Sequence, residues 1–473
     1  MERQSINTAV ARNLATTTKT PPQMGVISPR WLLRLLPWVN VESGTYRVNR
    51  VRMVGQRPGK IPIRYDTNRT DLPPDALRAI PLFAHVDAAL LNAMGERLVE
   101  RIFERGSLMV EEGKDAGTLY VLVMGKAEEF STGQHGEQLR HKVLAAGDFF
   151  GEEQLLTDSK SKCTVKALSQ CRTLTLNKAG LEASLDQVPE KKACFREAMG
   201  RLLAPCAPST EYLEQVIPIE AGHEGEPDLP EACVDYEEHP REYPLSPVQT
   251  TIRLHTRVSD LYNVPHNQLR EQVRLTVEAM KERQEWQLIN SPEFGLLKSA
   301  VSWMRAHTRS GRPTPDGMDE LLSLVWKKPA FFLAHPRAIA AFGRECTLRG
   351  VPPPYVTMFG SPFILWRGVP LIPCDKLEIT NCDGLARGKG TTNILLVRVG
   401  EAEQGVVGLH QLGIPGEIMP GVSARLMEIN QKAIATYLLT LYTSCAVLVD
   451  DAVGVLENVE VGYYPDDKRA TNE

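Results

Sequence analysis

Apolar positions recur at helical spacing in three segments of the second half of the chain. From Asn267 to Asn290 they lie on one face of a long helix, which Ser291-Pro292 ends. Thr314-Pro315 has the residues of an N-cap and a first helical position. A third helix is predicted to begin at Pro336 and to end at Gly350.

Runs with strand character follow these helices. They are FILW (363–366), NILLVRV (393–399), GVVGLH (405–410) and a final VLENVEVGY (455–463), and a further helix is expected at about Ala424–Tyr442. This mixture predicts an α+β domain between about Pro240 and Tyr464.

The stretch from about Leu72 to Leu203 has a different pattern. Helical patterns flank short alternating strands that are separated by glycines at positions 106, 113, 117, 125, 133, 136, 147 and 151. Short strands with glycine turns indicate a small antiparallel β-roll or barrel.

Composition separates these segments further. The chain has 473 residues, 42% of them hydrophobic and 24% charged, which is typical of folded protein. Met1–Lys60 carries ten basic and two acidic residues. Pro208–Pro240 carries ten acidic residues, five prolines and no Lys or Arg, which predicts an extended connector.

Several classes of protein are disfavoured. No apolar run approaches the ~20 residues of a membrane span, and Met1–Pro21 has no apolar signal-peptide core, so we expect a cytoplasmic protein without a membrane partner. A formal net charge of −4 disfavours a nucleic-acid partner. The nine cysteines form no C-x-x-C motif, which argues against a zinc ribbon or a redox site.

Catalytic signatures are also missing. The sequence has no H-E-x-x-H, G-x-S-x-G or strand-linked G-x-G-x-x-G motif. The pair His135/His141 is expected in a surface hairpin, and Gly388-Lys389-Gly390-Thr391 lacks the spacing of a phosphate loop. We therefore expect a protein that is not an enzyme, with no catalytic residues and no metal ligands.

One motif in the middle stretch is specific. Gly113, LYVLVMG (119–125) and GDFFGE (147–152) together closely resemble the cyclic-nucleotide-binding domain. The resemblance implies a phosphate-binding cassette that the F-G-E segment with Gly151 opens, and in which a short helix N-terminus donates N–H groups to the cyclic phosphate. Glu152 would bond the ribose 2′-hydroxyl, and Thr164 would lie near the phosphate. It also implies cAMP or another cyclic nucleotide as the ligand.

The cassette departs from the family at its phosphate-clamping arginine. Ser161 stands at that position, between Lys160 and Lys162. Serine cannot make a bidentate, charge-assisted contact with phosphate. Two readings stay open: the lysines partly replace the arginine, or the domain keeps its fold without tight nucleotide binding.

The flanks of this domain resemble family 2 encapsulins. The motifs are GTYRVNRVR (44–52), EEHPREYPLSPVQTTIRLHTRVSDLYN (237–263), KERQEWQLINSPEFGLL (281–297), AFFLAHPRAIAAFGRECTLRGV (330–351), WRGVPLIPCDK (366–376), QGVVGLHQLGIPGEI (404–418) and AVLVDDAVGVLENVEV (446–461). The inserted nucleotide-binding-like domain is taken as the mark of the 2B branch.

The resemblance implies the Hong Kong 97 phage-capsid fold, with an N-terminal arm, an extended loop, a peripheral domain with a spine helix and an axial domain. The predicted division is 1–71 for the arm and the start of the extended loop, 72–205 for the inserted β-roll, 206–240 for the acidic connector, and 241–473 for the peripheral and axial domains.

The resemblance also implies a function. Such subunits form a homo-oligomeric icosahedral shell, here expected as a 60-mer (T=1), around a cargo enzyme that carries a disordered targeting extension. The 2B branch implies a terpene cyclase or polyprenyl diphosphate synthase as cargo. Asp383, Arg387 and Lys389 are pore-loop candidates, or else belong to an ordinary solvated loop, and the sequence leaves open whether a second shell protein co-assembles.

Two other functions remain in view. A soluble cyclic-nucleotide-responsive regulator would be a small oligomer and would need a basic residue at Ser161. A prophage capsid protein would share the fold but would not be expected to carry the inserted domain.

Overall fold

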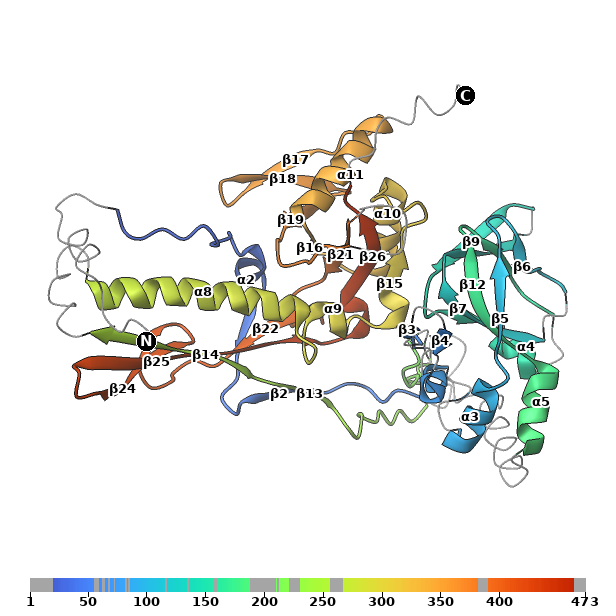
Figure 1. Cartoon of the computed structure of the whole chain (residues 1–473), viewed down its shortest axis with the longest axis horizontal. Coiled ribbons are helices and arrows are strands. Elements are labelled where there is room, and N and C mark those ends of the chain that lie inside the picture. Colours follow the sequence, from blue (N-terminus) through green and yellow to red (C-terminus); the bar gives the residue numbers. More distant parts are fainter. Residues whose placement is uncertain are drawn as a thin grey trace. The chain divides into compact units, whose positions relative to one another are not determined.

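The computed structural model describes residues 20–462, with gaps at 55–58, 62–63, 67–68, 72, 81–82, 84–85, 115–116, 134–135, 157–159, 188–209, 211, 221–229, 256–266 and 382–389. The chain divides into two compact units (Figure 1). Unit 1 comprises Met1–Val48, Arg241–Ala300 and Arg312–Glu473, and unit 2 comprises Asn49–Pro240 and Val301–Gly311.

One sheet of unit 1 is centred on a long strand, β25. Its strand order is β1-β22-β25-β24-β23, and β14 also pairs with β25. Ten residues of β14 pair antiparallel with β25, from Ser246 opposite Thr443 to His255 opposite Ile434. The strands are β1 (Trp38–Asn40), β14 (Ser246–His255), β22 (Val406–His410), β23 (Glu417–Met419), β24 (Val422–Ile429) and β25 (Ile434–Val447).

The second sheet of unit 1 mixes strand directions. Its order runs β26-β21-β16-β19-β18-β17, with β20 on β21, and β16 and β19 are parallel while the other pairs are antiparallel. The strands are β16 (Phe331–Ala334), β17 (Tyr355–Met358), β18 (Ser361–Trp366), β19 (Val369–Pro373), β20 (Thr380–Asn381), β21 (Gly390–Val397) and β26 (Val453–Glu460).

Side-chain caps begin two helices of unit 1, α8 after Asn267 and α10 after Thr314, the latter at the predicted N-cap. Asn267 accepts the Arg270 N–H at the start of α8, at 3.1 Å, and Thr314 accepts the Gly317 N–H at the start of α10, at 3.3 Å. The helical segments are α2 (Trp31–Leu35), α8 (Gln268–Asn290), α9 (Leu296–Ser299), α10 (Pro315–Leu324), α11 (Pro336–Leu348) and the short 3₁₀ turn η4 (Asp450–Ala452).

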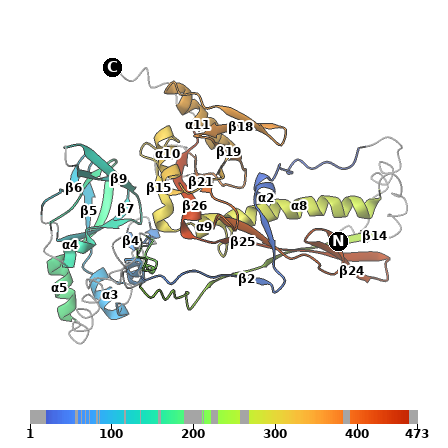
Figure 2. The same ribbon diagram turned by 180° about the vertical axis from the view of Figure 1, so that it is seen from behind.

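Helix α8 is the spine helix of a capsid-like fold. It lies along β14 and β25 (Figures 1 and 2), and Val277 and Met280 pack in one buried cluster with Ile252 and Leu439 of those strands. Burial of this apolar face, rather than helix propensity, supplies most of the stability of such a helix.

The helix expected at Ala424–Tyr442 is wrong, because this segment forms β24, a turn and most of β25. At the turn, Asn430 Oδ1 accepts N–H groups from Lys432 and Ile434, both at 3.0 Å. β25 is buried along most of its length, so it shows no alternation that would distinguish a strand from a helix, and pairing with distant β14 decides between them.

Unit 2 contains the predicted antiparallel β-roll, which is confirmed. Two sheets, β10-β7-β12-β5 and β6-β11-β8-β9, enclose its core. The roll strands are β5 (Val99–Phe103), β6 (Leu108–Val110), β7 (Thr118–Met124), β8 (Ala127–Thr132), β9 (Gln138–Leu144), β10 (Phe149–Phe150), β11 (Thr164–Ala167) and β12 (Cys171–Asn177).

Further elements complete unit 2. Val301–Gly311, which follows α9 in the chain, groups with the roll, and the Lys126 ammonium donates to the Thr308 carbonyl and to its hydroxyl. The remaining elements are β3 (Arg64–Asp66), β4 (Arg69–Asp71), η1 (Pro74–Ala79), α3 (Ala88–Gly95), α4 (Glu152–Leu156), α5 (Lys178–Gln187), η3 (Ser302–Met304) and β15 (Arg305–His307).

The chain crosses between the units at a two-stranded pair. Strand β2 (Thr45–Val48) is antiparallel to β13 (Arg241–Pro244). Beyond it, described parts of the acidic connector run beside the outgoing chain, since Arg52 N–H donates to Asp235 O at 2.8 Å. The predicted domain boundaries at 72, 205 and 240 remain predictions. Within the described residues, no helix has the length and apolar character that a membrane span requires.

Candidate functional site

A cavity of about 210 Å³ opens in the β-roll of unit 2. Its wall combines the end of β6, the hairpin β8–β9, strand β10 and the segment that contains α4 and β11. The lining residues are Val110, Glu129, Lys142, Phe149, Phe150, Gly151, Glu152, Gln154, Ser161, Lys162, Cys163 and Val165.

The backbone beside the cavity requires glycine. Gly151 has φ +86°, and a Cβ atom there would lie 2.3 Å from the carbonyl oxygen of Thr118. Next to it, Phe150 stacks on Tyr120 with ring centroids 4.9 Å apart. The turn from β10 into α4 is therefore fixed by close packing on β7, and any larger residue would displace it.

Ser161 occupies the place of the expected phosphate clamp and is itself held by the roll. It is buried, and its hydroxyl donates to the Cys163 carbonyl oxygen at 2.8 Å. Its backbone N–H donates to Lys114 O, and its carbonyl accepts from Gly113 N–H. The side chain is thus engaged with its own loop and presents no positive charge to the cavity.

Both signs of charge line the cavity. The Lys142 ammonium lies 3.6 Å from the Glu129 carboxylate, and Glu152 and Lys162 add one group of each sign. Burial, reinforced by nearby Glu129, raises the pKa of the Cys163 thiol to about 11. The thiol therefore stays protonated at neutral pH, and the lining charges balance.

The predicted cassette residues do not all meet at the cavity. Gly151, Glu152, Ser161 and Lys162 line it. Lys160 is exposed and is not among the lining residues. Thr164 is not among the lining residues either, and its hydroxyl accepts the N–H of Glu112 at 3.1 Å.

Sequence reasoning missed three polar lining residues, Glu129, Lys142 and Gln154. Alternation within the β8–β9 hairpin is the signal that places Glu129 and Lys142 on one face, because they are direct partners in the register. The pore-loop candidates Asp383, Arg387 and Lys389 lie outside the described residues, as does His135.

Comparison with known proteins assigns families to two parts of the chain. The family described as "Type 2A encapsulin shell protein SrpI-like" matches residues 204–463. The cyclic nucleotide-binding domain family matches residues 100–187, which carry the cavity.

Individual relatives agree with this assignment. The chain is 59% identical over 248 residues to the Type 2A encapsulin shell protein SrpI of Synechococcus elongatus, covering 52% of this chain and 78% of that protein. It is 49% identical over 315 residues to the Type 2A encapsulin shell protein of Mycolicibacterium paratuberculosis, covering 66% of this chain and 97% of that protein.

A solved structure extends the similarity to the fold. The cryo-EM structure of the holo-SrpI encapsulin complex from Synechococcus elongatus matches with a TM-score of 0.54 and 37% identity, covering 98% of this chain and 99% of that one. The Hong Kong 97-like shell fold with an added β-roll is confirmed, and the chain is a structural shell protein and not an enzyme.

These findings correct the predicted branch. The prediction of branch 2B rested on the presence of the inserted domain, whereas the shell sequence itself matches branch 2A. The expectation of an isoprenoid enzyme as cargo depended on branch 2B, so it is no longer supported. The chain belongs to the Type 2A encapsulin shell protein SrpI-like family, and it carries a cyclic nucleotide-binding domain within its shell sequence.

Proposed function

We propose that this chain assembles into a closed icosahedral shell of 60 identical subunits (T=1) that encloses a cargo enzyme. The observation that carries the proposal is the match to the holo-SrpI encapsulin complex over nearly the full length of both chains. A closed shell also needs contacts that join different surface patches of neighbouring subunits and that repeat by symmetry until the shell closes.

Exposed apolar side chains support assembly. The hairpin β23–β24 leaves Ile418, Met419, Leu426, Met427 and Ile429 each at least 40% exposed. An apolar edge of this kind would promote aggregation in a monomer. A neighbouring shell subunit is the partner that we propose for it.

Electron microscopy and mass measurement of the purified protein test the proposal. We expect uniform closed particles of about 3.2 MDa, which is 60 times the 52.6 kDa subunit. Dimers or small oligomers across salt and protein concentrations would instead favour a soluble regulator. Mass spectrometry of particles from the native source would identify the cargo.

For the cavity of unit 2 we infer weak binding of cyclic nucleotides. Ser161 offers no charge to a cyclic phosphate, and Lys142 is already paired with Glu129. Burying a phosphate against Glu129 and Glu152 without a bidentate cation is unfavourable.

Titration of the assembled protein with cAMP tests this second proposal. We expect Ser161→Arg to tighten binding at least tenfold, because the new guanidinium lies at the cavity wall. Lys160→Arg is the matched control, since it lies outside the wall and keeps its charge. Tight binding by the unmodified protein, unaffected by either change, would contradict the inference.

A further inference from the structure

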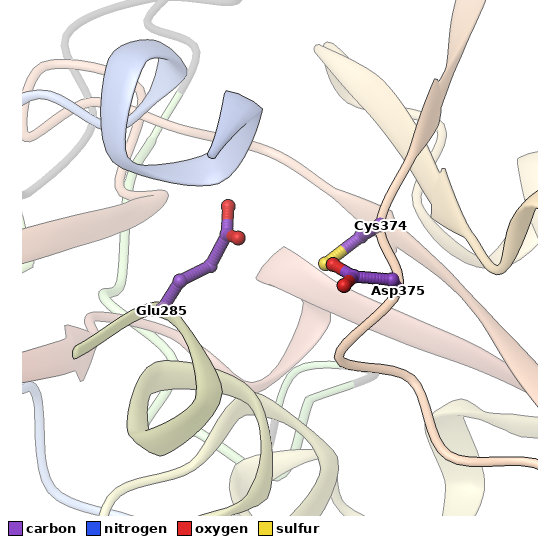
Figure 3. A group of neighbouring side chains, drawn as sticks. All are labelled: Glu285, Cys374 and Asp375. Carbon is purple, nitrogen blue, oxygen red and sulfur yellow. The ribbon is translucent and has the colours of Figure 1, made fainter. Parts of the chain in front are cut away.

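A thiol and two carboxylates meet in unit 1, where α8 passes the end of β19. Glu285 reaches up from α8, and Cys374 and Asp375 follow β19 directly. One potential ligand atom from each residue lies within 4.8 Å of the other two. Figure 3 shows the Cys374 and Asp375 side chains pointing from their strand end toward the side on which Glu285 lies.

One carboxylate oxygen of Glu285 has no hydrogen-bond donor among the described residues, and this points to a ligand. The residue is 1% exposed. Its Oε1 atom accepts the Leu32 N–H at 3.1 Å, whereas Oε2 is buried without a hydrogen-bond partner among the described residues. A buried carboxylate oxygen without a partner is unfavourable, so a cation or a proton belongs beside it.

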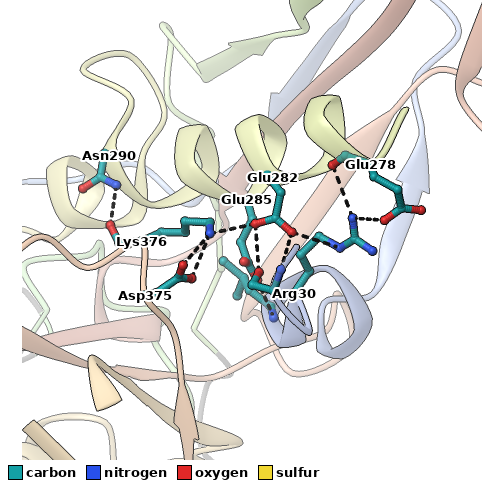
Figure 4. A network of polar contacts seen from close by, with 9 residues as sticks. Arg30, Glu278, Glu282, Glu285, Asn290, Asp375 and Lys376 are labelled. Atoms are coloured by element: carbon teal, nitrogen blue, oxygen red, sulfur yellow. Dashed lines mark hydrogen bonds and ion pairs between the residues drawn. The ribbon is translucent and has the colours of Figure 1, made fainter. Parts of the chain in front are cut away.

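Nearby cations are already engaged with other groups (Figure 4). The Lys376 ammonium lies 2.7 Å from Glu282 and 2.8 Å from each oxygen of Asp375. Arg30 lies 2.5 Å from Glu278. Neither side chain contacts the free oxygen of Glu285.

A charge count of this region leaves a deficit. The region holds four carboxylates and three basic groups. The carboxylates are Glu278, Glu282, Glu285 and Asp375, and the basic groups are Arg30, Lys281 and Lys376. The region carries one uncompensated negative charge when Glu285 is ionised. A divalent ion bound together with the Cys374 thiolate brings the sum to zero.

We propose that Glu285, Cys374 and Asp375 bind a divalent transition-metal ion of the zinc type, with water in the fourth position. Zinc accepts thiolate and carboxylate ligands together in tetrahedral geometry, at about 2.3 Å to sulfur and 2.0–2.2 Å to oxygen. Calcium and magnesium prefer oxygen ligands only, so the thiol disfavours them. Binding releases the Cys374 proton to solvent.

An ion can reach the site beside Asp375, because the side chain of this residue is 52% exposed and can rotate. Rotation of this side chain brings one oxygen to the ion while the other keeps its contact with Lys376. The ion would then join α8 to the loop after β19. Through the Leu32 N–H on Glu285, it would also hold α2 of the N-terminal arm in place.

Metal loading of the full-length assembled protein tests the site. After chelator treatment and dialysis against zinc or cobalt chloride, we expect one ion per subunit by elemental analysis. Cobalt should give a thiolate-to-metal charge-transfer band and intense visible bands of a tetrahedral ion. Both signals should vanish in Cys374→Ser.

Two further variants keep the test decisive if Cys374→Ser fails to fold. Asp375→Asn changes an exposed side chain and should weaken cobalt binding at least tenfold. Lys376→Met removes a competing cation and should tighten cobalt binding. Cys233→Ser, at an exposed cysteine of the connector, is the matched control and should change neither signal.

Three outcomes would overturn the proposal. The first is the absence of any retained ion, in which case Glu285 is simply protonated. The second is retention of the ion and its charge-transfer band in Cys374→Ser. The third is loss of both signals in Cys233→Ser, which would assign the metal to the exposed thiol.

Discussion

In unit 1, buried and partly buried ion pairs join segments that are far apart in the sequence, whereas at the cavity of unit 2 the lining pair joins two strands of one hairpin. Arg398, 2% exposed, meets Asp451, and Arg30 of the N-terminal arm meets Glu278 of α8. Around the cavity, Glu129 and Lys142 face each other across a hairpin.

The two units therefore retain different things. In unit 2, Gly151 fixes the backbone beside the cavity, and the Ser161 hydroxyl bonds to its own loop. Unit 1 uses its charges to fix its own chain. The following changes separate the contribution of such a glycine from that of such a charge.

The largest effect is expected for Asp451→Asn. The Asp451 carboxylate forms ion pairs with Arg398 Nη2 at 2.5 Å and with Lys327 Nζ at 2.7 Å. The change therefore leaves a buried guanidinium without its counter-charge. We expect a loss of about 3–5 kcal/mol in the free energy of unfolding, measured by urea denaturation. Glu403→Gln, in the exposed pair with Lys328, should cost less than about 1 kcal/mol.

The same pair predicts a pH dependence. Burial alone would raise the pKa of Asp451, but hydrogen bonds from Lys327 and Arg398 outweigh it and lower the pKa. A lowered carboxyl pKa gives stability that is full above the unfolded-state value, about 3.9, and is lost as pH falls through the folded-state value. Urea midpoints measured from pH 6 downward should fall less steeply in Asp451→Asn than in the unmodified protein.

A smaller loss, about 2–4 kcal/mol and confined to unit 2, is expected for Gly151→Ala. The new Cβ would combine an unfavourable φ with a 2.3 Å approach to Thr118 O. Hydrogen exchange should accelerate in β7 and β12. Gly136→Ala is the control, because φ is +82° but nothing lies within 4 Å. Equal effects of the two changes would show that packing on β7 is unimportant.

The smallest effect is expected for Arg30→Gln. It removes the contacts to Glu278, in a pair whose side chains are 14% and 23% exposed, and should cost about 1–3 kcal/mol. Faster hydrogen exchange in α2 would be the readout. Arg47→Gln, in an exposed pair with Glu242, should cost under about 1 kcal/mol, and a larger cost there would remove the contrast.

Local signals explain what could be predicted from the sequence. The helices that begin after Asn267 and Thr314 follow from caps within three residues of the first turn. The helix predicted at Ala424–Tyr442 is wrong because the structure of this segment depends on β14, nearly 200 residues away in the chain. Pairing between strands so far apart in the chain leaves no signal in the sequence of either strand alone.

The same distinction holds for the sites. Gly151 and Glu152 lie in one contiguous motif and are recognisable, whereas Cys374 and Asp375 meet Glu285 only through the packing of α8 beside β19. The prediction of branch 2B is wrong for another reason: it rests on the inserted domain, whereas the shell sequence matches branch 2A.

The pairing of β2 with β13 has an evolutionary consequence. Val48 and Arg241, which flank the long insertion, are direct partners in the register. A chain that leaves and returns at one hairpin can gain or lose everything beyond it without rethreading the shell. The Mycolicibacterium relative aligns over 97% of its own length with only 66% of this chain. Because β2 and β13 hold the two ends of the intervening segment side by side, a change in the length of that segment leaves their register unaltered.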